Sequence, residues 1–454
     1  LLSFYMRANY ALKEKYLFTF TGRSDASSKF PQNNRVGYFP SGGIAWRISE
    51  EGFMKRASWL SELKLRASAG YTGTQNIGDN LFYTLYTPGS YGGTNAMIPT
   101  QLGNSKIKSE TTLQKDLGLD FAMFRSRLRG TIGYYEKDTR DMLLTVGVAT
   151  SSSFNTVTSN LARIRNRGLE IDLRGELVRG GSFQWIAALN ISGNRSKVMN
   201  INNDFTDPTI DPAVAQYYLG NSIVRNGEPV GLFYGKMFEG IAQTQKQVDD
   251  YKASFPYYIY FARYMGIGDP MYKLDSTGFP ATDVIGNSQP KFFGGFTNTF
   301  TYKNFNLVAL LTYSYGGEIL YLSDIQNKAF TGATNKGVRI LGRWTPENPG
   351  SDRPRLLLGQ NGYNYTASND VYDGSYIKLK SITLTYALSN TLMKKARMQQ
   401  ASIYVSATNL FTISNYPGPD PEVSNNPYSL INGSNDNATY PTIRQFSAGV
   451  RIGF

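Results

Sequence analysis

The sequence predicts an all-β fold, an antiparallel transmembrane β-barrel, and three observations lead to this prediction. The last ten residues alternate strictly, so that one face carries Phe446, Ala448, Val450, Ile452 and Phe454 and the other carries polar or tiny residues. The alternation recurs along the chain, and the connections between alternating segments are short and long in turn. Aromatic residues make up 14% of the 454 residues, with 32 Tyr and 26 Phe, which suits two aromatic girdles.

Composition excludes several classes of protein. No apolar run approaches the roughly 18 residues that a membrane-spanning helix needs, so any crossing must use a closed barrel. The absence of Cys and His excludes Cys or His metal sites, thiol nucleophiles and His-based triads within this chain. The net charge is +13, but Lys and Arg are scattered along the predicted strands, which favours lumen lining and contact with anionic lipid over nucleic acid. We therefore expect no enzyme activity and no cofactor.

Four strands are predicted near the amino terminus. Each has apolar residues at alternate positions, with mostly Ser, Thr, Asn, Gly, Lys or Arg between them, as in a strand with one lipid face and one wet face. In chain order the apolar positions are Phe4, Met6, Ala8 and Tyr10, then Tyr16, Phe18 and Phe20, then Ile44, Trp46 and Ile48, and then Leu63, Leu65, Ala67, Ala69 and Tyr71.

The middle of the chain predicts four more strands, in residues 116–123, 127–134, 169–176 and 183–192. The third of these alternates Leu169, Ile171 and Leu173 with the charged residues Glu170 and Asp172. A strand that alternates aliphatic residues with full charges must have one face in water. In its neighbour, large apolar residues again occupy every second position.

Five strands complete the pattern, in residues 293–302, 305–313, 376–388, 402–411 and 445–454. In the third of these the alternation slips between Leu379 and Ile382, which predicts a β-bulge of one extra residue. The segment 231–241 also resembles a strand, but a single crossing there would reverse the direction of every earlier strand. We therefore expect it to be an extracellular β-arm, or one strand of a pair.

The connections predict which end of each strand faces the cell exterior. Short or medium connections lie at residues 12–15, 49–61, 124–127, 178–182, 303–304 and 389–400. Between them lie long ones rich in Gly, Asn, Ser, Thr and Pro, at residues 24–36, 72–112, 144–162, 195–291, 317–374 and 414–444. Outer-membrane barrels have short periplasmic turns and long extracellular loops, whereas sandwiches and propellers have no reason to keep this alternation.

Several short motifs follow one another in a fixed order along the chain. They are residues 34–41 (NRVGYFPS), 45–51 (AWRISEE), 63–66 with 70–73, 166–170 (NRGLE), 376–386 (YIKLKSITLTY), 409–411 (NLF), 420–423 (DPEV) and 440–454. In this order and spacing they resemble the SusC/RagA family of TonB-dependent outer-membrane transporters. The resemblance covers essentially the whole chain.

The resemblance implies a barrel of about 22 strands, an amino-terminal plug domain and a SusD-like surface lipoprotein that sits on the extracellular loops as a lid. It also implies uptake of oligosaccharides or peptides across the outer membrane of a Gram-negative bacterium, energised through the TonB complex. The sequence departs from the family in two respects. It contains no plug domain or TonB-binding segment. Between residues 268 and 285 it also lacks the Asp-rich run, similar to a calcium-binding loop, that many relatives have there. The residues that remain, Asp269, Asp275 and Asp283, are too sparse for the oxygen cage that calcium prefers.

The strand count predicts that residues 1–454 are a barrel portion. About 13 strands is an odd number, whereas bacterial single-chain barrels have even numbers because both termini lie in the periplasm. An open sheet in lipid would also leave unpaired backbone groups along two edges. We therefore expect about 13 or 14 carboxy-terminal strands here. Roughly nine more strands and the plug should come from sequence upstream of Leu1, in a separate or longer chain.

Candidate contact residues lie in the long loops. Five aromatic residues there could stack on sugars or pack against a lid, although packing within the loop is the simpler interpretation; they are Tyr83, Tyr86, Tyr91, Tyr363 and Tyr365. The acidic pairs Asp249 with Asp250 and Asp420 with Glu422 could in principle perform glycosidase chemistry, but a solvated or interface role is favoured. The glycine-rich stretch at residues 70–78 lacks the ending of a phosphate-binding loop.

Two functions from different classes fit this sequence. The preferred one is an energised importer without chemistry of its own, and the alternative is a structural or adhesive surface barrel. An upstream plug domain would distinguish them, because only the importer needs one. In either case we expect the last strand to serve as the assembly signal of the barrel, through the apolar residues Phe446, Val450, Ile452 and Phe454.

Overall fold

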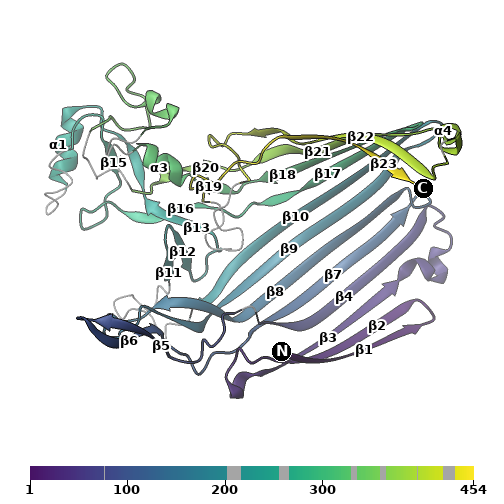
Figure 1. Ribbon diagram of the computed structural model, residues 1–454, viewed down its shortest axis with the longest axis horizontal. Coiled ribbons are helices and arrows are strands. Elements are labelled where there is room, and N and C mark those ends of the chain that lie inside the picture. Colours follow the sequence, from purple (N-terminus) through teal and green to yellow (C-terminus); the bar gives the residue numbers. More distant parts are fainter. Residues whose placement is uncertain are drawn as a thin grey trace.

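Most of the chain belongs to one large antiparallel sheet. The computed structural model describes all residues except 76, 202–215, 255–264, 329–334, 358–364, 396 and 423–434. The sheet has 13 strands, and each pairs with its neighbours in chain order (Figure 1). These strands are β1 (Leu2–Leu12), β2 (Tyr16–Ala26), β3 (Val36–Arg47), β4 (Leu60–Thr74), β7 (Glu110–Met123), β8 (Leu128–Gly147), β9 (Thr156–Gly180), β10 (Phe183–Ile201), β17 (Phe292–Tyr302), β18 (Phe305–Tyr315), β21 (Tyr376–Ala387), β22 (Gln400–Ser414) and β23 (Gln445–Gly453).

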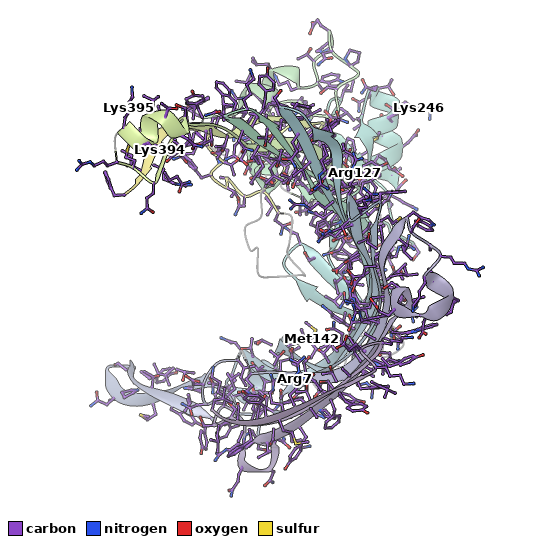
Figure 2. The ribbon with its side chains drawn as sticks, turned by 90° about the vertical axis from the view of Figure 1, so that its right-hand side faces the viewer. Arg7, Arg127, Met142, Lys246, Lys394 and Lys395 are labelled. Atoms are coloured by element: carbon purple, nitrogen blue, oxygen red, sulfur yellow. The ribbon has the colours of Figure 1, made fainter. Side chains whose placement is uncertain are left out.

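The prediction of an all-β antiparallel barrel sheet is confirmed, with a strand at every predicted position. Viewed from the short-turn end, the sheet curves into an arc with one open side (Figure 2). The first and last strands, β1 and β23, form its two edges and do not pair with each other. No described helix is both long enough and apolar enough to span a membrane.

The register keeps the two faces separate across the strands, because residues directly opposite each other point to the same side of a sheet. One row of opposed residues on the convex face runs through Tyr10, Phe18, Ile44, Ala67, Leu117, Tyr134 and Leu169. A parallel row on the concave face runs through Thr19, Gly43, Ser68, Asp116, Tyr135 and Gly168. The periodicity of the sequence therefore becomes one apolar and one polar surface.

The predicted β-bulge is confirmed in β21. Its pairing with β18 jumps from Ser381 to Leu379 and skips Lys380. Its pairing with β22 shifts at the same place, and there Asn409 adopts a positive φ of 54°. Asn tolerates this left-handed conformation better than most residues. This explains why the motif at residues 409–411 begins with Asn.

The long connections gather at one end of the sheet and build smaller elements of their own (Figure 1). They contain a hairpin of β5 (Leu85–Tyr91) and β6 (Thr94–Gln101), a four-stranded sheet of β11 (Gln216–Leu219), β12 (Ser222–Arg225), β13 (Leu232–Lys236) and β16 (Thr282–Asn287), and the pairs β14 (Phe238–Ile241) with β15 (Pro270–Tyr272) and β19 (Glu318–Leu320) with β20 (Val371–Asp373). The helices there are η1 (Gln32–Asn34), η4 (Thr150–Ser152), α1 (Gln245–Ala253), α3 (Leu322–Lys328), η6 (Val338–Gly342) and η8 (Ser368–Asp370).

The structure shows what two of the predicted connections form. The segment 231–241 does not cross with the large sheet; it forms β13 and β14, whose partners are β12, β16 and β15. The predicted loop 144–162 is shorter in the structure, because β8 extends to Gly147 and β9 begins at Thr156. Inside the arc, Ile164 and Val198 of the large sheet pack with Val224 of β12 in a buried cluster. This cluster fixes the inserted sheet to the concave side.

The opposite end of the sheet has the short turns and three small helices, η2 (Ile48–Glu50), η3 (Gly52–Met54) and α4 (Asn390–Lys395). Glu51 ties two of these turns together. Its carboxylate accepts hydrogen bonds from Lys15 Nζ at 2.9 Å, Tyr16 Oη at 2.8 Å and Trp46 Nε1 at 3.1 Å. These hydrogen bonds lower the pKa of Glu51 to about 2, and the bond from Lys15 has the largest effect. The motif at residues 45–51 thus supplies both Trp46 and its acceptor.

Candidate functional site

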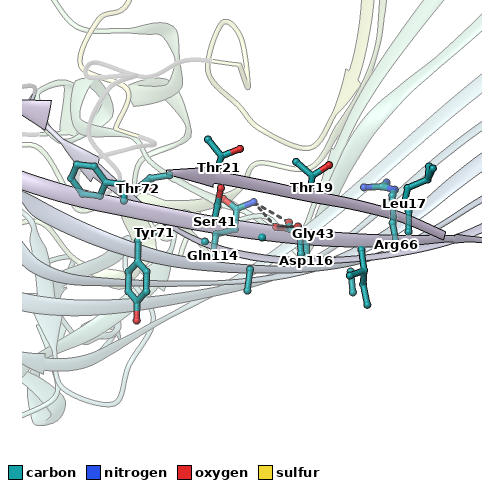
Figure 3. A pocket seen from close by; sticks show the side chains of 18 of the residues that line it. Leu17, Thr19, Thr21, Ser41, Gly43, Arg66, Tyr71, Thr72, Gln114 and Asp116 are labelled. Atoms are coloured by element: carbon teal, nitrogen blue, oxygen red, sulfur yellow. Dashed lines mark hydrogen bonds between the residues drawn. The ribbon is translucent and has the colours of Figure 1, made fainter. Parts of the chain in front are cut away.

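The concave face is the more polar face of the sheet, as the row through Thr19, Ser68 and Asp116 shows. A hollow of about 540 Å³ lies over β2, β3, β4 and β7, and its polar lining includes Thr19, Ser41, Arg66, Gln114 and Asp116 (Figure 3). Gln114 Nε2 donates to the two oxygens of Asp116 at 2.9 and 3.1 Å. The side chains of this wall therefore hold one another in place while they face the hollow.

One group of charged side chains on this face is paired across neighbouring strands. The carboxylate of Asp120 in β7 forms ion pairs with two residues of β4: Lys64, whose Nζ lies 2.8 Å away, and Arg66, whose Nε lies 3.2 Å away. Thr131 of β8 donates to the same carboxylate at 3.1 Å. Such a wall offers donors and acceptors to a polar solute and contains no arrangement of nucleophile and base. Its chemistry suits passage and binding.

Two aromatic rings lie over glycines of adjacent strands. A Cβ added to Gly73 would lie 2.1 Å from Cζ of Phe39, and one added to Gly168 would lie 2.3 Å from Cζ of Tyr135. These distances are far below van der Waals contact, so only glycine fits beneath either ring. Arg23 completes the first pair, with its guanidinium carbon 5.3 Å from the centre of the Phe39 ring. Two of the family motifs, at residues 70–73 and 166–170, therefore contain the glycine of such a pair.

At the long-loop end, a buried ion cluster attaches residues 415–444 to the sheet. Lys378 of β21 is 1% exposed. Its Nζ lies 3.1 Å from Asp420 Oδ2, 2.7 Å from Glu422 Oε2 and 2.8 Å from Thr442 Oγ1. Lys380 Nζ approaches the same Glu422 oxygen at 2.8 Å.

The environment of this cluster favours the charged forms of both acids. Burial alone would raise the pKa of Asp420, but hydrogen bonds from Thr442, the Glu422 amide and Lys378 outweigh it and lower that pKa. Burial also opposes ionisation of Glu422, and its hydrogen bonds from Lys378 and Lys380 again lower the pKa. The structure thus places the predicted pair Asp420 and Glu422 side by side, facing two lysines of the same chain.

Further buried polar contacts hold the loop end together. Asp324 of α3 is 1% exposed and forms ion pairs with two arginines. One is Arg353, and the other is Arg339, whose Nη1 lies 2.8 Å from the Asp324 carboxylate. Nearby, Tyr416 Oη donates to Asp436 Oδ2 at 2.6 Å. Burial, followed by this bond to an ionised acceptor, raises the pKa of Tyr416. The sequence analysis missed these contacts, because nothing in the sequence relates Asp324 to an arginine 29 residues away.

The aromatic candidates separate into two groups. Tyr83, Tyr86 and Tyr91 lie in or beside the β5–β6 hairpin, and Tyr91 is 82% exposed at its tip. Tyr86 contacts Phe154 edge-on, with ring centres 6.2 Å apart. Tyr365 packs inside the loop end instead, perpendicular to Tyr272 at 6.0 Å. Tyr363 lies outside the described residues.

The remaining sequence candidates lie apart from one another. Asp269 is fully buried against Arg355, whose Nε lies 2.7 Å from Asp269 Oδ1, while Asp275 accepts hydrogen bonds from Thr277 within its own turn. Asp283 faces Arg225 at 3.5 Å. The terminal residues Phe446, Val450, Ile452 and Phe454 are all exposed on or beside β23. Asp249 and Asp250 lie on α1, where they bond to Gln245 and Lys246.

Comparison with known proteins gives consistent matches. The family model described as "TonB dependent receptor-like, beta-barrel" matches residues 2–410. TonB-dependent receptor P3 of Formosa agariphila is 34% identical over 100% of this chain and 45% of its own length. TonB-dependent receptor SusC of Bacteroides thetaiotaomicron is 29% identical over 94% of this chain and 42% of its own length.

Solved structures agree with the sequence relatives. The structure of the RagAB peptide transporter matches with a TM-score of 0.81 and 25% identity, over 100% of this chain and 47% of that one. The RagAB peptide importer in its closed-closed state gives a TM-score of 0.80. The chain therefore spans about half the length of the curated relatives that it matches.

Proposed function

The chain belongs to the TonB-dependent receptor β-barrel family and forms a barrel portion, and from this membership we propose that it is part of an energised outer-membrane importer of oligosaccharides or peptides. The family implies the outer membrane of a Gram-negative bacterium. Its relatives are named as receptors, and a similar solved structure is named as a transporter, so we infer binding and transport and not catalysis. Import of a bound solute therefore replaces catalysis as the function to be explained.

The observation that supports import is the contrast between the two faces of one sheet. The convex face carries successive rows of apolar residues that suit lipid, and the concave face carries paired charges and hydroxyl groups that suit a hydrated solute. Closed by further strands, such a sheet encloses a polar path. We propose that the rest of the barrel, the plug domain and the contact with TonB are supplied outside residues 1–454.

We also propose a SusD-like lipoprotein as the lid on the long-loop end. The β5–β6 hairpin projects there and exposes Tyr91, Met97 and Ile98 at its surface. Exposed aromatic and sulfur-containing residues on a projecting arm are typical of protein interfaces. The structural similarity to the RagAB peptide transporter supports the search for such a partner.

Uptake by cells that lack the gene tests this proposal. We expect deletion to abolish growth on the oligosaccharides or peptides that the receptor carries, and the whole receptor to restore it only when TonB is functional. A parallel assay of surface attachment tests the adhesive alternative. Unchanged uptake of both solute classes together with lost attachment would overturn the importer and favour an adhesive barrel.

Purification from native membranes tests the lid. We expect the wild-type receptor, extracted in gentle detergent, to bring a lipoprotein with it, and a variant without residues 85–101 to lose most of that lipoprotein. Purification of the wild-type receptor alone, at every detergent concentration tried, would contradict the proposed partner.

A further inference from the structure

The convex face changes character abruptly near the long-loop end of β7 to β10. One row of opposed residues there contains Leu117, Tyr134 and Leu169 and is apolar. The next row on the same face, two residues further along each strand, contains Lys115, Glu136, Arg167 and Arg195. The row after that contains Leu113, Asp138, Arg165 and Lys197.

The orientation of these side chains follows from the alternation of the strands. Ile164 and Val198 are buried in the cluster on the concave side. Their neighbours Arg165 and Lys197 must therefore point to the convex side. Exposure agrees, because Arg195 and Lys197 are exposed whereas Val198 is completely buried.

Positive charge exceeds negative charge in this cationic patch. It combines two carboxylates, Glu136 and Asp138, with seven cations, which are Lys115, Arg140, Arg163, Arg165, Arg167, Arg195 and Lys197. Arg167 Nε lies 2.7 Å from Glu136, and Arg163 Nη2 lies 2.6 Å from Asp138. The two carboxylates are thus already occupied by arginines.

Several donors of the patch remain available to a ligand. Among the described residues no carboxylate pairs with Arg195 or Lys197, and both side chains are exposed. Guanidinium groups bind phosphate through two parallel hydrogen bonds, and lysine adds a point charge. The chemistry of the patch therefore suits a phosphate group.

The position of the patch identifies the source of that phosphate. It lies on the face that contacts lipid, directly beyond the last apolar row, where the headgroups of a bilayer begin. We propose that this patch binds the phosphate groups of a phosphorylated glycolipid in the outer leaflet. The leaflet rests on the proposed function, which places the long loops outside the cell, whereas the binding itself does not depend on transport.

A binding experiment on the whole receptor tests this site. The probes are lipid A carrying its phosphate groups and the same lipid A after enzymatic dephosphorylation, added to receptor that has been stripped of bound lipid in detergent. We expect the Arg195→Gln/Lys197→Gln variant to bind phosphorylated lipid A on the order of tenfold more weakly than wild type, because each cation near a headgroup contributes separately. A Lys137→Gln/Arg174→Gln variant removes the same charge from the concave face and should bind like wild type.

Two further measurements complete the test. Wild-type binding should weaken with added salt and on dephosphorylation of the probe. This measurement uses the wild-type receptor alone and so does not depend on whether a variant folds. Equal binding by both double variants, or equal wild-type binding of both probes, would overturn the proposal. So would a change in the association of receptor copies with unchanged lipid binding, since the patch would then be a contact between copies. Loss of lipid binding with normal uptake leaves the importer proposal intact, and lost uptake with normal lipid binding affects that proposal alone.

Discussion

At the scale of single residues, glycine is retained at positions 73 and 168 because neighbouring rings occupy its side-chain space. Replacing Gly73 with Ala would place a methyl group against the Phe39 ring, and overpacking of this kind costs about 1–3 kcal/mol. We expect Gly73→Ala to lower the urea midpoint of the folded receptor in detergent, followed by tryptophan fluorescence. Gly133→Ala is the control, since nothing lies within 4 Å of an added Cβ there. Equal midpoints for both variants would argue against the ring-over-glycine account.

Lys378 holds the last long loop through charge. Replacing it with Met leaves Asp420 and Glu422 without their shared buried cation, and removing one partner of a buried ion pair costs about 3–5 kcal/mol. We expect proteolysis within residues 415–444 to become much faster in Lys378→Met. Lys380→Met should have a smaller effect, because Lys380 is partly exposed and contacts only Glu422 of the pair. Equal protease resistance of Lys378→Met and wild type would show that other contacts hold the loop.

The same cluster predicts a pH dependence. The pKa values of Asp420 and Glu422 are lowered in the folded chain, so their contribution is complete above the ordinary carboxyl range and is lost as the pH falls through the lowered values. We expect the wild-type loop to resist an acid-active protease at about pH 5 and to lose resistance only below about pH 4. Loss of resistance between pH 7 and 5 would contradict ionised, paired carboxylates.

At the scale of elements, the final strand is predicted to direct assembly. Phe454 is 85% exposed at the end of β23, on the convex side of an edge strand. We expect deletion of Phe454, or Phe454→Asp, to reduce the amount of folded, heat-modifiable receptor in the outer membrane. Ser447→Asp introduces the same charge on the other face of β23 and should assemble more normally. Wild-type levels of folded receptor from the Phe454 variants would count against this role.

The strands could be predicted from the sequence because period-two alternation is a local signal that each segment carries by itself. The bulge at Lys380 was predictable for the same reason, since it appears as a slip between Leu379 and Ile382. The small sheets of the loop end were not predictable, because β13 pairs with β16 although β14, α1 and β15 lie between them in the sequence. Asp420 and Glu422 were identifiable as a pair, but their partner Lys378 is defined only by the fold.

At the scale of the whole molecule, the two faces of the curved sheet determine what the chain can do. The convex face presents apolar rows that suit lipid and carries a cationic patch where those rows end. The concave face carries polar and charged side chains, several of which are paired across neighbouring strands. The loop end is held together by buried ion clusters, which suits a surface that must keep its shape for a ligand or a lid.

The central claim, that one face meets lipid and the other water, is tested most directly by spin labels along β4. The sequence contains no Cys, so nitroxides can be attached to single-cysteine variants at consecutive positions from Lys64 to Tyr71, in the whole receptor with any other cysteine replaced. In bilayers we predict accessibility to oxygen that alternates with a period of two, with maxima at Leu65, Ala67, Ala69 and Tyr71. Uniform accessibility, or maxima at Arg66, Ser68 and Gly70, would contradict the account.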